Sequence, residues 1–168
     1  MFKIEYKISR TDYDDFVGEK GYYKIFCNEN AYGEIFSDEL EEIMGTEYLY
    51  DWFEDMVKIA LELHNVSYIV LSNIESYNLW IEFIRNEDIL SVSLVNADKP
   101  DGTGSVAYEL FNKCDDKNLW KDEEVSFTEF KKELVRVVTD YIKDVKTYNT
   151  DKNIEKCYLL QECLQNLN

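Results

Sequence analysis

Apolar and polar residues alternate at the start of the chain, which is the period of a half-buried β-strand. Phe2–Ser9 and Gly21–Cys27 both follow this pattern. We therefore expect two strands here, with residues 12–18 forming the connection between them.

Three further runs in the middle of the chain are rich in β-forming residues. They are Val66–Leu71, Asn78–Ile84 and Ile89–Val95. Because only residues 85–88 separate the last two runs, the spacing predicts an antiparallel hairpin. The turn-forming segment 98–104 follows, and we expect Ser105–Phe111 to continue the meander.

Spacings of three and four between apolar residues predict helices elsewhere. Thr46 is a suitable N-cap for a helix of four to five turns that extends to Leu63, and a shorter helix is expected over residues 38–44. In the last third, Ser126 and Glu129 form a capping box ahead of a long apolar stripe. A second helix near residues 150–151 should then pack against it as a hairpin.

These elements predict an α+β fold in one domain spanning residues 1–168. We expect one antiparallel sheet of about five to six strands, with a central helix and a C-terminal helical hairpin packed on it. The chain is 45% hydrophobic and 15% aromatic, so it has the material for a substantial core.

Charge is distributed very unevenly along this chain. The formal net charge is -17, and residues 25–57 contain ten carboxylates and no lysine or arginine. Such a block destabilises a compact fold by self-repulsion but strengthens long-range attraction to a cationic partner. Binding to nucleic acid or to an anionic membrane is not expected, because no basic cluster is present to contact phosphates.

The acidic block also contains aromatic residues, and this combination is typical of protein-binding surfaces. We expect a partner-binding surface formed by carboxylates together with two tyrosines. Its candidate residues are Glu34, Asp38, Glu39, Glu41, Glu42, Glu47, Tyr48, Tyr50, Asp51 and Asp55. The alternative is that these carboxylates form only a solvated face.

Catalytic and metal-binding signatures are weak. His64 is the only histidine, and neither carboxylates nor thiolates stand near it at metal-ligand spacing. Residues 101–105 contain two glycines but lack the lysine of a phosphate-binding loop. We therefore expect no cofactor, no metal and no catalysis, while an enzyme with a cryptic carboxylate site is kept as a minor alternative.

Four short motifs resemble the small acidic immunity proteins of bacterial polymorphic-toxin and contact-dependent inhibition systems. The motifs are Gly33–Ser37, Trp52–Glu54, Trp80–Ile84 and Phe127–Phe130. The resemblance implies a protein that binds and neutralises a cognate toxin domain without catalysis of its own. It transfers no contact residue, because contacts in this class differ between partners.

The expected partner is thus a basic protein, such as a toxin domain, and the expected state is a monomer or weak dimer. The competing interpretation is an interaction or assembly module without a toxin partner. The four cysteines are widely scattered, and Met1–Glu5 does not resemble a signal peptide. We therefore expect reduced thiols and a cytoplasmic location.

Overall fold

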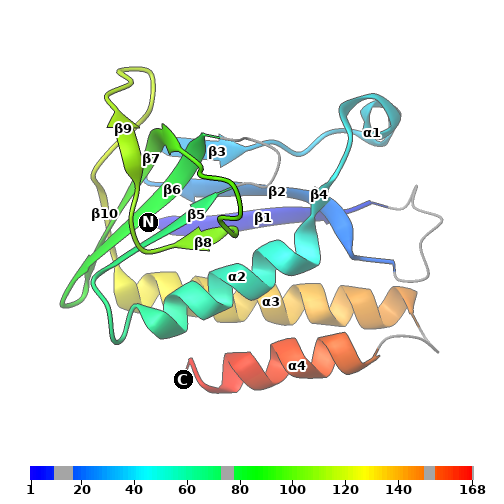
Figure 1. Cartoon of the computed structure of the whole chain (residues 1–168). Coiled ribbons are helices and arrows are strands. Elements are labelled where there is room, and N and C mark those ends of the chain that lie inside the picture. Colours follow the sequence, from blue (N-terminus) through cyan, green and yellow to red (C-terminus); the bar gives the residue numbers. More distant parts are fainter. Residues whose placement is uncertain (10–16, 73–77, 150–153, 168) are drawn as a thin grey trace.

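The computed structural model describes residues 1–9, 17–72, 78–149 and 154–167, and its fold is α+β (Figure 1). The predicted fold class is confirmed. The described strands form two antiparallel sheets, however, where one sheet was expected. The strands are β1 (Phe2–Ile8), β2 (Lys20–Cys27), β3 (Asn30–Gly33), β4 (Glu47–Tyr48), β5 (Tyr68–Ser72), β6 (Leu79–Asn86), β7 (Ile89–Asp98), β8 (Val106–Ala107), β9 (Phe111–Cys114) and β10 (Glu123–Ser126). The helices are α1 (Asp38–Met44), α2 (Leu49–Glu62), α3 (Phe127–Tyr148) and α4 (Ile154–Gln165).

The first sheet, sheet A, is built around β2. Strand β1 pairs with one edge of β2. Strands β3 and β4 pair with two different segments of its other edge. The second sheet, sheet B, has the order β10-β7-β6-β5-β8, and β9 also pairs with β7. The expected hairpin of β6 and β7 is confirmed, whereas β8 pairs with β5 and so does not extend the meander beyond β7.

Helices α2 and α3 pack against the sheets, and α4 lies beside α3 in the opposite direction (Figure 1). The predicted C-terminal helical pair is therefore present. Its second helix is described from Ile154 onward, so the expected start near residues 150–151 lies outside the described residues, as do residues 12–16 of the expected connection 12–18.

The core lies between the sheets and these helices, and alternation along β1 explains how it is filled. Phe2, Ile4 and Ile8 point to the helices and are buried. The ring of Phe2 meets Phe130 of α3 at 4.9 Å between centroids. The amphipathic stripes of α2 and α3 supply the opposite side of this core.

The starts of the two long helices test the capping predictions. Ser126 is the N-cap of α3, and its hydroxyl accepts a hydrogen bond from the backbone N–H of Glu129 at 3.3 Å. Helix α2 begins at Leu49, after Tyr48, and so Thr46 is not its N-cap. The reason is that Glu47 and Tyr48 pair with β2 as strand β4 before the helix begins.

Candidate functional site

The acidic block lies where the chain leaves β2 and returns to it. Strand β3 pairs with Lys24–Cys27, and β4 pairs with Lys20–Gly21. Tyr22 and Tyr23 lie between these two pairings, and no described strand covers them on that side. Residues 34–46, which we call the acidic arm, leave the sheet at this gap and include α1.

Gly33 is required at the point where the acidic arm leaves β3. Its φ is +86°, and a Cβ there would collide with the backbone carbonyl of Tyr23. The chain therefore turns away from β2 at this residue, which leaves the edge beside Tyr22 and Tyr23 open.

Contacts with Lys7, Ser9 and Tyr22 attach the arm to the outer face of sheet A. The carboxylate of Glu41 is buried, lies 2.8 Å from Nζ of Lys7, and accepts a hydrogen bond from the Ser9 hydroxyl at 3.0 Å. The ring of Phe36 meets Tyr22 edge-on at 5.4 Å. Hydrogen bonds to Asp38 and Glu41 raise the pKa of Lys7, so the lysine stays charged beneath the arm.

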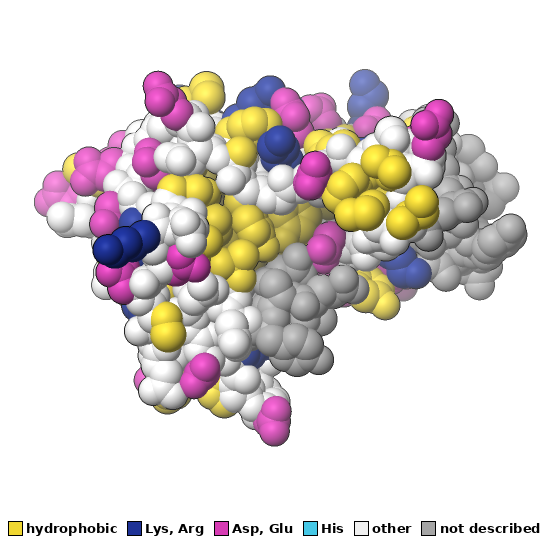
Figure 2. Space-filling model, turned by 90° about the horizontal axis from the view of Figure 1, so that it is seen from above, with side chains coloured by type: hydrophobic (Ala, Val, Ile, Leu, Met, Phe, Trp, Pro, Cys, Tyr) yellow, Lys and Arg dark blue, Asp and Glu magenta, His cyan; other side chains and the backbone are white. Residues whose placement is uncertain are grey.

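Above these anchors, α1 exposes apolar side chains to solvent. Leu40, Ile43 and Met44 are 42%, 76% and 52% exposed, and Tyr48 beyond the arm is 46% exposed. Figure 2 shows hydrophobic side chains gathered over this region and in the neighbouring hollow, with acidic side chains at the border. An exposed, contiguous apolar surface of this kind is typical of interaction sites.

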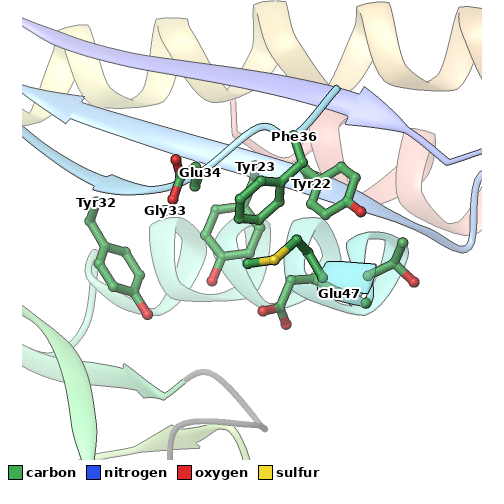
Figure 3. A pocket seen from close by; sticks show the side chains of 10 residues that line it. Tyr22, Tyr23, Tyr32, Gly33, Glu34, Phe36 and Glu47 are labelled. Carbon is green, nitrogen blue, oxygen red and sulfur yellow. The ribbon is translucent and has the colours of Figure 1, made fainter. Parts of the chain in front are cut away.

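A cavity of about 360 Å³ opens at the gap in the edge of β2 (Figure 3). Aromatic and acidic side chains make up most of its wall. The lining residues are Tyr22, Tyr23, Tyr32, Gly33, Glu34, Phe36, Met44, Gly45, Thr46 and Glu47. Figure 3 shows the hydroxyl ends of Tyr23 and Tyr32 and the carboxylate of Glu47 directed to the same side of this cavity, which we call the tyrosine cavity.

The back of the tyrosine cavity is held rigidly. The ring of Tyr23 stacks on Trp52 of α2, with centroids 3.9 Å apart and planes 14° from parallel. Burial raises the pKa of Tyr23 well above its ordinary value, and the neighbouring Tyr32 and Glu47 raise it further. The phenol is therefore a neutral donor throughout the physiological range, and the formal charges on the wall are those of carboxylates.

The predicted binding residues differ in exposure, and one of the exposed residues, Asp38, also forms an ion pair with Lys7 at 2.5 Å. Glu34, Asp38, Glu39 and Asp51 are exposed, as is Tyr48, whereas Glu47 and Asp55 are half-buried. The side chain of Glu42 lies outside the described part of the chain.

Two of the candidates are buried, and the prediction that they lie on the surface is wrong. Tyr50 is 5% exposed, and its hydroxyl donates to the backbone carbonyl of Lys156 at 3.0 Å. Glu41 is also 5% exposed, because it pairs with Lys7 beneath α1. Both side chains serve the fold, and neither is available to a partner.

The acidic residues of α1 and α2 also lie on opposite faces of sheet A. Lys7 and Tyr22, on the outer face, contact the acidic arm, while Tyr23, on the inner face, stacks on α2. Asp55 of α2 accepts a hydrogen bond from Ser105, next to β8, and burial raises its pKa. The single surface expected from Glu34 to Asp55 is thus divided, and only its α1 part lies beside the tyrosine cavity.

Sequence reasoning missed Tyr22, Tyr23, Tyr32 and Phe36 as site residues. Two adjacent tyrosines in a strand point to opposite faces, so one of them was bound to lie away from the core formed by α2. That signal was present, but the gap between β3 and β4 depends on pairings that local patterns do not reveal.

The single histidine, the four cysteines and the helices are the remaining features that could bear on metal binding, thiol chemistry or membranes. In the described ranges, no group of three or more His, Cys, Asp or Glu side chains could hold a metal ion. His64 is exposed just after α2, with its ring 5.3 Å from that of Phe127. All four cysteines are free thiols. Among the described helices, none is both long and apolar enough to cross a lipid bilayer.

Comparison with protein-family models, with curated proteins and with solved structures finds no match to this chain. The resemblance of its short motifs to immunity proteins therefore stays a prediction.

Proposed function

We propose that this protein is an immunity-type inhibitor, which binds a basic toxin domain through the acidic arm and blocks it. The observation that carries the proposal is the composition of the arm's outer surface. Leu40 and Ile43 of α1 are exposed, and the same arm carries the exposed carboxylates of Glu34 and Glu39. An apolar centre with a charged border is the usual anatomy of a protein-binding patch.

The sign of the charge favours a basic partner. Carboxylates around the patch attract a cationic surface from a distance and repel an acidic one, so they speed association and reject wrong partners. The ion pair between the buried Glu41 and the half-buried Lys7 fixes α1 before the partner arrives, which reduces the entropy lost on binding.

The proposal is tested by a growth assay in which this chain is co-expressed with the toxin domain encoded beside its own reading frame. Co-expression should restore growth. If cells that produce the neighbouring domain stop growing equally with and without this chain, the proposal is wrong.

A charge-reversal pair then tests the acidic arm itself. Glu34→Lys combined with Glu39→Lys should slow association with the purified toxin domain about tenfold at low salt, because the steering field is reversed locally. The matched control, Asp101→Lys with Glu162→Lys, changes net charge equally at two exposed sites elsewhere. Equal slowing by both pairs would contradict a specific role for the arm.

The second candidate is an assembly module, because exposed apolar side chains on α1 could also join copies of this chain. The same carboxylates oppose that role, since two acidic arms brought together repel each other. The two candidates therefore differ in the oligomeric state they require.

A further inference from the structure

The tyrosine cavity has the chemistry of a receptor for one organic cation, and we propose that it takes the guanidinium group of an arginine side chain from the bound partner. This inference deepens the proposed function. The identity of the partner rests on that function, whereas the choice of a cationic group rests on the cavity alone.

The composition of the wall determines the charge of the ligand. Tyr32 and Phe36 supply half-buried aromatic rings, and Tyr22 and Tyr23, which are 3% and 4% exposed, form the back of the cavity. Glu34 and Glu47 supply carboxylates, and none of the described lining residues is a lysine, an arginine or a histidine. Aromatic faces attract cations, and carboxylates pair with them, so both kinds of group favour the same ligand. An anionic ligand would be repelled by the two carboxylates.

Size and geometry favour an organic cation. The cavity of about 360 Å³ is at the small end of ligand pockets, which span about 300–1,000 Å³. A guanidinium group is planar, stacks on aromatic rings and presents several N–H donors to a carboxylate, which suits a wall made of rings with Glu47 on one side. The hydroxyls of Tyr23 and Tyr32 point to the same side as that carboxylate (Figure 3).

The position of the cavity indicates that the cation belongs to a protein. Met44 lines the cavity and is also part of the exposed apolar surface of α1, next to Ile43. A partner that covers Ile43 and Met44 therefore also contacts the wall of the cavity. An arginine on that partner would reach the cavity without a separate binding event.

The wall is formed before any ligand binds. Stacking of Tyr23 on Trp52 and the edge contact of Phe36 with Tyr22 hold three of the rings in place. The close approach of Gly33 to Tyr23 fixes where the acidic arm leaves the sheet. Binding then orders few side chains, which favours affinity for a small group.

The experiment is an NMR titration of the isotopically labelled protein with N-acetyl-arginine amide. Signals of Tyr23, Tyr32 and Glu47 should shift in a saturable way. The neutral isostere N-acetyl-citrulline amide, which has the same shape without the charge, should leave them unchanged. Equal shifts with both probes would overturn the inference.

Two variants test the assignment to this cavity. Glu47→Gln keeps the shape and removes the charge, and it should weaken the arginine probe about tenfold, because the charged acceptor of the hydrogen bond becomes a neutral amide. The control Glu29→Gln makes the same charge change at an exposed residue that does not line the cavity. If both variants weaken probe binding equally, the effect comes from the overall charge of the protein, and the assignment to this cavity is wrong.

Met44→Lys is a second test, at a half-exposed position that tolerates a polar residue. It places an ammonium group at the wall of the cavity, and it should abolish probe binding while the circular-dichroism spectrum stays that of the folded protein. Retention of full affinity in this variant would overturn the assignment.

Two further probes identify the source of the cation. The tripeptide Leu-Arg-Leu should bind more tightly than the amide, because its apolar residues also cover Leu40 and Ile43. Choline represents a free small cation, and tighter binding of choline than of the arginine probes would overturn the assignment to a protein partner. Loss of toxin protection with intact probe binding would refute the proposed function alone, and the converse result would refute this inference alone.

Discussion

Tyr48 and Tyr50 are two residues apart and have different surroundings. Tyr48 is 46% exposed, with Nζ of Lys20 lying 5.8 Å from the centre of its ring. Tyr50 is buried, and its hydroxyl bonds to the carbonyl of Lys156 in α4. Only the first can contact a partner, and the second ties α2 to the C-terminal helix.

Replacing Tyr50 tests this separation of roles. Tyr50→Phe should lower the free energy of unfolding by about 1 kcal/mol, because it removes one buried hydrogen bond and keeps the ring. Urea unfolding followed by circular dichroism measures the change. Tyr48→Phe is the matched control and should leave stability within error, and partner affinity should be unaffected by Tyr50→Phe. An unchanged stability in Tyr50→Phe would contradict the structural role.

At the scale of elements, the turn between β6 and β7 helps to start α3. Asp88 in that turn accepts hydrogen bonds from the backbone N–H of Thr128 at 3.0 Å and from the hydroxyls of Thr128 and Ser126, both at 2.8 Å. A carboxylate at a helix N-terminus also interacts favourably with the helix dipole. The hairpin of sheet B and the longest helix are thus fixed relative to one another.

This contact makes stability depend on pH. The hydrogen bonds from Thr128 and Ser126 hold the pKa of Asp88 below its ordinary value of 3.8. The unfolded chain therefore binds the proton more readily, so Asp88 stabilises the fold above pH 3.8, and this contribution is lost as the pH falls through the lower pKa of the folded state.

Asp88→Ala should accordingly lower the free energy of unfolding at neutral pH, and its difference from wild type should shrink under acidic conditions. Urea unfolding at a series of pH values measures the difference. Asp101→Ala, at an exposed turn residue, is the control and should show little effect at any pH. A difference for Asp88→Ala that is constant with pH would contradict this account.

Helix α3 shows what the sequence could predict and why. The start of α3 was predicted correctly, because Ser126, Glu129 and the apolar stripe after them are local signals. Strands β3 and β4 were not predicted. They have only four and two residues, and each is recognised only by its pairing with a separate segment of β2. Strands this short contain too few residues for an alternation of apolar and polar positions to be recognised.

The site was predicted only in part for a related reason. The exposed carboxylates of the acidic arm follow from composition, whereas the tyrosine cavity depends on where β3 ends and β4 begins. Burial of Tyr50 could have been inferred, since its spacing to Phe53 and Val57 places all three on one face of α2. Burial of Glu41 could not, because its partner Lys7 is distant in sequence.

At the scale of the whole molecule, the net charge of -17 governs encounters with other proteins. The field of 35 acidic against 18 basic residues repels further copies of this chain and attracts cationic surfaces. Salt at physiological strength reduces the range of that field to about 8 Å. Selection of a basic partner by charge therefore operates only within about that distance of the surface.

This field predicts the oligomeric state. Sedimentation equilibrium at low ionic strength should give a monomer of 20.0 kDa, because repulsion between acidic arms exceeds the attraction of the apolar side chains on α1. Added salt should allow at most weak self-association, and Ile43→Lys should remove it. A stable dimer at low salt would instead support the assembly module.

The way in which β3 and β4 share one edge of β2 has a consequence for how specificity could change. Both ends of residues 34–46 are fixed by ladders that do not depend on what lies between them. Each doubling of the length of such a loop costs only about 0.6 kcal/mol in closure entropy. The segment can therefore be lengthened, shortened or replaced without a change in the core. Such changes would let the same fold acquire new partners.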